Sequence, residues 1–166
     1  MSPFETCLAA LRQPAPPEAF FMVLDKALAE VVGHKLFTLL YVAPDRKRVK
    51  RLYTNMPKEY PVGGYKPVME TDWHKRVVGE GQAWVGYSYD DVKWAFFDHE
   101  LIRSLGCESA INKPVVYAGR VLGTMNLLDE AGHYKASDPD KLDSFAALMI
   151  GPFLDAIAAD PDIGRK

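Results

Sequence analysis

Cys107 is the residue with the most distinctive potential chemistry, because a cysteine thiolate is a nucleophile and can be oxidised and reduced. It lies in the stretch "GCESAINKPVV", whereas the other cysteine, Cys7, lies near the start of the chain. The pair indicates neither a disulfide framework nor the ligand spacing of a zinc site. Two alternatives stay open for Cys107: a reactive thiol acting on a small oxidised metabolite, or a small buried apolar residue.

Aromatic side chains are concentrated in residues 84–99, although the chain as a whole is only 11% aromatic. Small-ligand pockets are mostly apolar, and aromatic rings supply flat contact surfaces. We therefore predict a ligand pocket in this segment, which is the least regular part of the chain by pattern; the alternative is that the rings seal a sheet face. The predicted lining residues are Trp84, Tyr87, Trp94, Phe96, Phe97 and His99, with Trp73 from a preceding short helix.

Polar residues among apolar neighbours form a second group of candidates. Asn112 and Asn126 lie in strand-like runs, and a buried amide needs hydrogen-bond partners, either in a ligand or in a neighbouring loop. His99 and Arg103 are four residues apart on an expected helix and therefore share a face. That face is either part of a site for an anionic ligand or a solvated helix side.

Other chemistry has little support. The four histidines show no metal-ligand spacing, and motifs for a serine nucleophile or a phosphate-binding loop are missing from the sequence. The net charge of −2 gives no general attraction to nucleic acid or to an anionic membrane. Five basic residues between 46 and 51 are expected at a solvated hairpin tip. No run is apolar for long enough to span a membrane, and no secretory signal is evident, so a cytoplasmic location is expected.

Helices are predicted near both ends of the chain. Apolar periodicity indicates a short helix at 4–12 and a longer one that begins after Pro16 and ends at Gly33. A last helix begins with a capping box at Ser137 and is kinked by Pro152.

Strands are predicted at 35–44 and 48–55, at 82–88, and at 109–116 and 120–128. The first and last pairs are joined by short turns, so the sheet should be largely antiparallel. Gly123 in mid-strand indicates a bulge or a close approach of backbone. Two short helices are expected, one capped at Thr71 and one from Phe97 to Leu105. The whole pattern indicates an α+β fold.

The stretch "LIRSLGCESAINKPVVYAGRVLGTMNLLDEAGHYKASDPDKLDSFAALM" resembles the second half of a GAF domain. The matching positions are Leu105, Gly106, Ser109, Pro114, Val115, Gly119, Gly123, Asn126, Leu127, Leu142, Phe145 and Ala146. The resemblance implies an antiparallel sheet of five or six strands, with the N- and C-terminal helices on one face and a ligand pocket on the other. It divides the chain into an N-terminal helical extension (1–16), a stand-alone GAF domain (17–160) and a tail (161–166).

GAF domains usually bind a small molecule, dimerise through their terminal helices and serve in signalling proteins. The resemblance therefore implies a homodimeric sensor for an unidentified small molecule. One enzyme family of this fold, free methionine-(R)-sulfoxide reductase, has its catalytic cysteine in a segment like "CESAIN", where Cys107 lies. This chain lacks that family's upstream cysteines, so we expect a binding module rather than an enzyme. A reductase and a ligand-free interaction module are the alternatives.

Overall fold

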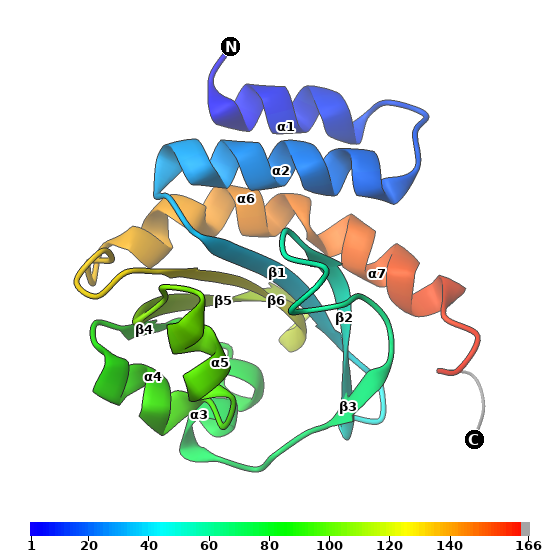
Figure 1. Ribbon diagram of the computed structural model, residues 1–166. Helices are drawn as coiled ribbons and strands as arrows, with labels where there is room; N and C mark the ends of the chain where they lie inside the picture. Colours follow the sequence, from blue (N-terminus) through cyan, green and yellow to red (C-terminus); the bar gives the residue numbers. More distant parts are fainter. Residues whose placement is uncertain (164–166) are drawn as a thin grey trace.

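The computed structural model describes residues 1–163 and shows an α+β fold built on one six-stranded antiparallel sheet. Helices from both ends of the chain cover one face, and the helices between β3 and β5 lie on the other (Figure 1). The predicted fold class is therefore confirmed. Among residues 1–163 no single helix is long and apolar enough to cross a membrane; the bent pair at 138–148 and 150–159 reaches that length and hydropathy only when taken together.

The strands follow the order β3-β2-β1-β6-β5-β4 across the sheet. Their bounds are β1 Leu36–Val42, β2 Arg48–Thr54, β3 Tyr65–Pro67, β4 Trp84–Gly86, β5 Ser109–Tyr117 and β6 Arg120–Asp129. Both predicted hairpins, β1–β2 and β5–β6, are present. The short edge strand β3 was not predicted, because it lies in a segment rich in Pro and Gly.

The helices fall into two groups. On one face lie the terminal helices: α1 Pro3–Leu11, α2 Pro17–Val31, α6 Asp143–Leu148 and α7 Ile150–Ala159. A 3₁₀ turn at Asp138–Leu142 leads directly into α6. On the other face lie the middle helices: α3 Asp72–His74, α4 Tyr89–Ala95 and α5 His99–Ser104. Helix α3 continues as a π-helical turn at Lys75–Gly79. Helix α4 was not predicted, because its residues were expected to form a loop between the strand at 82–88 and the helix that begins near Phe97; that expectation is wrong.

Alternation along the strands separates two apolar clusters, because successive side chains of a strand point to opposite faces. Phe37 and Leu39 of β1 face the terminal helices and pack with Phe21 and Phe153. Leu36 and Val42 of the same strand face the middle helices. Helix α1 adds an outer layer, since Phe4 meets Phe145 of α6 with ring centroids 5.6 Å apart. The division into an extension, a domain and a tail stays a prediction, and residues 164–166 of that tail lie outside the described residues.

Local sequence features account for the helix ends. Gly33 ends α2 with a φ of +84°, and its N–H donates to the carbonyl of Leu28 at 3.0 Å. Pro152 has no N–H to offer Leu148, so the last helix breaks at Met149 and the two segments are bent by 52°. The predicted kink is confirmed. The capping box at Ser137 is wrong, because the Ser137 side chain makes no cap bond and Asp138 accepts from the backbone N–H of Lys135 instead.

Gly123 marks a place where the core approaches the backbone of β6. A methyl group there would collide with the carbonyl of Leu40 and come within 2.7 Å of the Phe153 ring of α7. The predicted close approach is therefore confirmed, and it lets α7 lie flat against the sheet.

The end of α7 is fixed to the sheet by the buried carboxylate of Asp160. This carboxylate accepts hydrogen bonds from the hydroxyls of Tyr41 and Tyr65 and lies 3.2 Å from the ammonium of Lys50. Burial alone would raise the pKa of Asp160, but the hydrogen bonds from Tyr41 and Tyr65 outweigh it, so the pKa is well below its ordinary value. Strands β1, β2 and β3 are thereby tied to one point at the end of the last helix.

We expect Asp160→Asn to lower the free energy of unfolding by about 2 kcal/mol at neutral pH, because charge-assisted hydrogen bonds are lost. A carboxyl with a lowered folded-state pKa stabilises the fold above its unfolded pKa and loses this effect as the pH falls toward the folded value. The stability gap between wild type and variant should therefore stay constant from neutral pH to about pH 5 and shrink below about pH 4. Urea denaturation at several pH values measures the gap. Asp155→Asn, an exposed change on the same helix, is the control; an equal loss in both variants would contradict the assignment.

Candidate ligand-binding site

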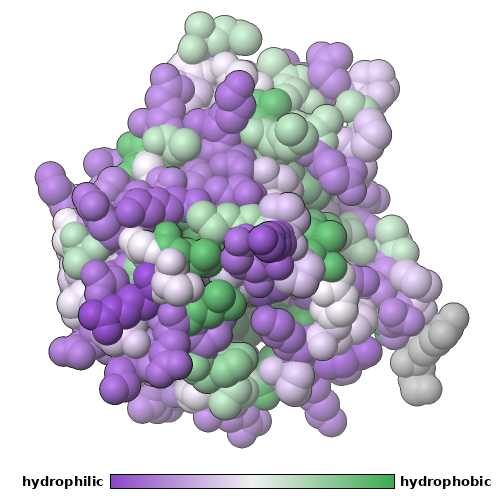
Figure 2. Space-filling model, viewed as in Figure 1, coloured by the Kyte–Doolittle hydropathy of each residue, from purple (hydrophilic) through white to green (hydrophobic). Residues whose placement is uncertain are grey.

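A cavity of about 590 Å³ lies between the sheet and the segments on its middle-helix face. Its floor is made by β1, β2 and β6, and its walls by residues 66–78 and 93–98. Figure 2 shows apolar residues gathered around a hollow in the lower centre of the molecule, between β3 and the α3–α5 segment. The volume is in the range of small-molecule sites.

Four rings in edge-to-face or stacked contact form one wall. Trp73 meets Phe96 with centroids 5.5 Å apart, and Phe96 meets Trp84 at 5.9 Å. Trp84 then stacks on Trp94 at 6.0 Å. Trp73, Trp94 and Phe96 line the cavity together with Phe97, and Trp94 and Phe97 are 57% and 74% exposed. Aromatic pairs of this geometry add stability beyond burial alone, so the wall is held independently of a ligand.

Trp84 and Tyr87 do not line the cavity. Trp84 is the buried member of this group of four rings, and its indole ring covers the backbone of Gly86. Tyr87 is 44% exposed, and its backbone N–H donates to Asp91 at the start of α4. Trp84 belongs to the small core on the same side of the sheet as the cavity, and Tyr87 follows the end of β4.

Asn112 and Asn126 belong to a hydrogen-bonded row that crosses the sheet. The indole N–H of Trp73 donates to Oδ1 of Asn112 at 3.0 Å, and Nδ2 of Asn112 donates to Oδ1 of Asn126 at 2.8 Å. Nδ2 of Asn126 donates to the hydroxyl of Thr38 at 3.2 Å. The amides lie directly opposite each other in the β5–β6 register and are almost fully buried. They do not line the cavity; they fix Trp73, which does.

His99 and Arg103 share a face of α5, as predicted, but that face lies outside the cavity. The guanidinium of Arg103 lies over the Tyr89 ring, with its Cζ 4.3 Å from the ring centroid, and the Tyr89 hydroxyl is 2.7 Å from Nδ1 of His99. Arg103 also lies 3.3 Å from Glu108. These contacts join α5 to α4, so both side chains have partners within the protein.

Cys107 is completely buried in the core on the middle-helix side, and burial raises the pKa of its thiol to about 11. Cys7 is equally buried, but in the core on the terminal-helix side of the sheet. A nucleophilic thiol needs exposure and a lowered pKa. The geometry of both cysteines is that of small apolar core residues.

Several cavity residues were not predicted from the sequence. Leu40, Val42 and Thr124 form the floor, and β-strand alternation alone could have indicated them. Lys66, His74 and Lys93 supply polar groups, and their sequence context contains no such signal. Burial, followed by the nearby charge of Arg46, lowers the pKa of His74, while Glu70 acts in the opposite direction. The imidazole is thus neutral at neutral pH.

The basic residues of the β1–β2 hairpin are largely engaged within the fold. Arg46 donates to the carbonyl of Val121 at 2.7 Å, and Arg48 lies 3.1 Å from Asp45. Arg51 is buried and donates to the carbonyl of Pro61. Together with the Lys50–Asp160 pair, these contacts leave little of the basic run as a free surface.

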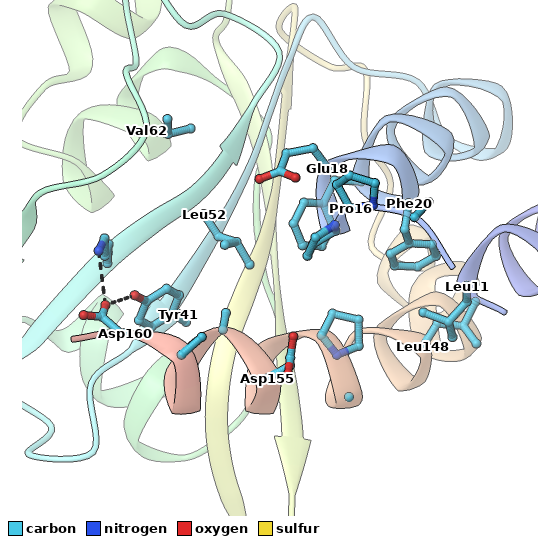
Figure 3. A pocket seen from close by; sticks show the side chains of 18 of the residues that line it. Leu11, Pro16, Glu18, Phe20, Tyr41, Leu52, Val62, Leu148, Asp155 and Asp160 are labelled. Carbon is cyan, nitrogen blue, oxygen red and sulfur yellow. Dashed lines mark hydrogen bonds and ion pairs between the residues drawn. The ribbon is translucent and has the colours of Figure 1, made fainter. Parts of the chain in front are cut away.

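A second concavity, a groove of about 770 Å³, lies on the terminal-helix face between α2 and α7. Figure 3 shows Leu52 of β2 on its floor, Leu11, Phe20 and Leu148 at one end, and Tyr41 bonded to Asp160 at the other. The bend after α6 opens this groove, because it turns α7 away from α2. The carboxylates of Glu18 and Asp155 lie on its two sides.

Comparison with known proteins identifies the fold. No protein-family model and no curated protein sequence matches the chain. Among solved structures, the GAF domain of a phosphoenolpyruvate-protein phosphotransferase from Acinetobacter is similar with a TM-score of 0.73 and 11% identity, covering 95% of this chain and 94% of that one. The GAF domain of a two-component sensor histidine kinase from Bacillus halodurans is similar with a TM-score of 0.65 and 13% identity, covering 88% of this chain and 97% of that one.

A phycocyanobilin-bound GAF domain from a cyanobacterial phytochrome gives a TM-score of 0.68 at 10% identity, covering 95% of this chain and 93% of that one. The chain therefore has the fold of a GAF domain over nearly its whole length, with helices on both sheet faces and a cavity on one of them. This confirms the fold implied by the sequence resemblance. At such low identity the likeness concerns the fold alone.

We expect Asn112→Ala to destabilise the protein by about 3 kcal/mol, because it leaves the indole N–H of Trp73 and an oxygen of Asn126 buried without partners. Thermal and urea denaturation measure the loss. Gln82→Ala, which removes an exposed amide close to β4, should change stability by less than about 0.5 kcal/mol. If the two variants were equally stable, the row would not be an essential contact.

Proposed function

We propose that this protein is a small-molecule-binding sensor module of the GAF type. The observation that carries the proposal is the cavity of about 590 Å³, with its aromatic wall, on the middle-helix face of the sheet. The wall is fixed by hydrogen bonds and ring contacts before any ligand enters, and a preorganised site binds with a smaller entropic cost.

The structural neighbours support a regulatory role, since they include GAF domains of a sensor histidine kinase and of a phytochrome with a bound bilin. A cytoplasmic location fits this role and is part of the proposal. Catalysis is not part of it, because the buried thiol of Cys107 has the wrong environment for a nucleophile.

The uncharged dye N-phenyl-1-naphthylamine tests the cavity, because its fluorescence rises when it enters an apolar site. We expect saturable binding to the wild type and a rise in melting temperature at saturating dye. Leu40→Trp, which places a bulky ring in the cavity floor, should weaken binding by about tenfold. Fluorescence titration of both proteins measures the change.

Leu101→Trp is the matched control, because Leu101 is 40% exposed on α5 and does not line the cavity. It should bind the dye like the wild type. Absence of saturable binding to the wild type, or equal binding by the Leu40 variant, would overturn the proposal that this cavity is a ligand site.

We also infer a homodimer formed through the terminal helices. The groove between α2 and α7 supports this, because it presents apolar side chains of the terminal helices, such as Leu11 of α1, Phe20 of α2 and Leu148 of α6. An apolar groove of this size on a helical surface is favourable to bury against a second copy of the chain.

Ala147→Glu tests the dimer, because Ala147 is exposed in this groove. A carboxylate there adds negative charge to a groove that already contains Glu18 and Asp155, and should weaken dimerisation by about tenfold. Sedimentation equilibrium measures the association constant. Ala131→Glu, an exposed change in the loop after β6, should dimerise like the wild type. A monomeric wild type, or an unaffected Ala147 variant, would refute this interface.

A further inference from the structure

The charged side chains of the cavity are unequal in sign. Lys66 of β3 and Lys93 of α4 line it from two different walls, and Asp98 is the one carboxylate that lines it among residues 1–163. Within the described part of the chain, neither lysine is within ion-pair distance of a carboxylate. Both side chains are largely exposed, so a ligand that enters the cavity from solvent can reach them.

Asp98 is already occupied by groups of the protein. Its Oδ2 accepts a hydrogen bond from the hydroxyl of Tyr60 at 2.7 Å. The guanidinium of buried Arg51 lies over the Tyr60 ring, 4.8 Å from its centroid. The negative charge of Asp98 attracts both Arg51 and Lys66. Asp98 is therefore shared by two cations, Arg51 and Lys66, and a net positive charge remains at this end of the cavity.

The environment of Lys66 reflects that excess. Partial burial first, and then the charge of Arg51, lower the pKa of its ammonium group, and Asp98 only partly opposes them. A ligand anion beside Lys66 would relieve both effects, because it stabilises the charged form of the lysine.

His74 contributes a polar atom without a partner. It lines the cavity, and its Nε2 is buried with no hydrogen-bond partner among residues 1–163. A buried polar atom left without a partner costs free energy. Because Nε2 has almost no accessible surface, a ligand in the cavity would contact other atoms of the His74 ring.

The remaining lining is apolar and suits a flat body. The rings of Trp73 and Phe96 form the wall, and Leu40, Val42 and Val78 contribute aliphatic surface. The exposed rings of Trp94 and Phe97 lie at the rim with Lys93, which precedes Trp94 directly on α4. Apolar and cationic groups therefore meet at the same opening.

We propose that the ligand of this cavity is an amphipathic organic anion, whose ring-containing apolar body lies against Trp73 and Phe96 and whose negative group is received by Lys66 and Lys93. This inference rests on the proposed function, since it names the class of molecule that the same cavity binds. The hydroxyl of Tyr60 and the indole N–H of Trp73 are already used by Asp98 and Asn112, so the two lysines are the groups that select the charge of the ligand.

Two dyes with the same anilinonaphthalene body test the charge preference. 8-Anilinonaphthalene-1-sulfonate carries one negative group, and N-phenyl-1-naphthylamine carries none. We expect the anion to bind wild type about tenfold more tightly than the neutral dye, as for a hydrogen bond to a charged group. Added NaCl should weaken the binding of the anionic dye and leave the binding of the neutral dye unchanged, because salt screens charges near the surface.

The double variant Lys66→Gln/Lys93→Gln should lose this preference while its affinity for the neutral dye stays unchanged, which also shows that the cavity is intact. Lys26→Gln on α2, an exposed lysine on the opposite sheet face, should behave like the wild type. The two single variants should each lose part of the preference, about threefold, which keeps the test decisive if the double variant is unstable.

The outcomes separate the two proposals. Equal affinity of wild type for both dyes, or a preference that survives in the lysine variants, would overturn the anion inference and leave the cavity as a ligand site. Failure of both dyes to bind, or binding of either dye that Leu40→Trp does not weaken, would overturn the proposed function as well.

Discussion

The row of hydrogen bonds from Trp73 through Asn112 and Asn126 to Thr38 is the contact on which the cavity depends. Polar side chains are costly in the middle of a sheet unless all of them are paired. Here each amide meets its partner in register across β5, β6 and β1, and the chain of donors ends at an indole of the opposite wall. The sheet thereby holds a wall at a fixed place without filling the space beside it with apolar side chains.

Two differently used faces follow from this arrangement. On the terminal-helix face, α2, α6 and α7 lie on the sheet, and Gly123 permits the approach of Phe153. On the other face, short helices reach the strands mainly near β4 and β5, where Val77, Val92 and Ile102 join a smaller core. The hollow lies beside that core, over β1 and β2. Stability is supplied chiefly by one face, which leaves the other free to keep a cavity.

Sequence patterns indicated the scaffold better than the site. Strand alternation, Gly33, Gly123 and Pro152 each report a local backbone requirement, so their consequences were predictable. Helix α4 also left a signal that was missed: Ser88 caps it, and Val92, Ala95 and Phe96 recur at helical spacing toward the small core. Strand β3 and the direction of Lys66 could not be predicted, because a three-residue edge strand forms only through its pairing with β2.

Strand β3 connects the cavity with the end of the last helix. Two adjacent residues of the strand, Tyr65 and Lys66, point to opposite sides. The hydroxyl of Tyr65 donates to Asp160 at the end of α7, and Lys66 lines the cavity. The strand is short and has a partner on only one side, β2. Because Tyr65 and Lys66 are adjacent in the chain, one short strand joins the C-terminal end of α7 to the lining of the cavity.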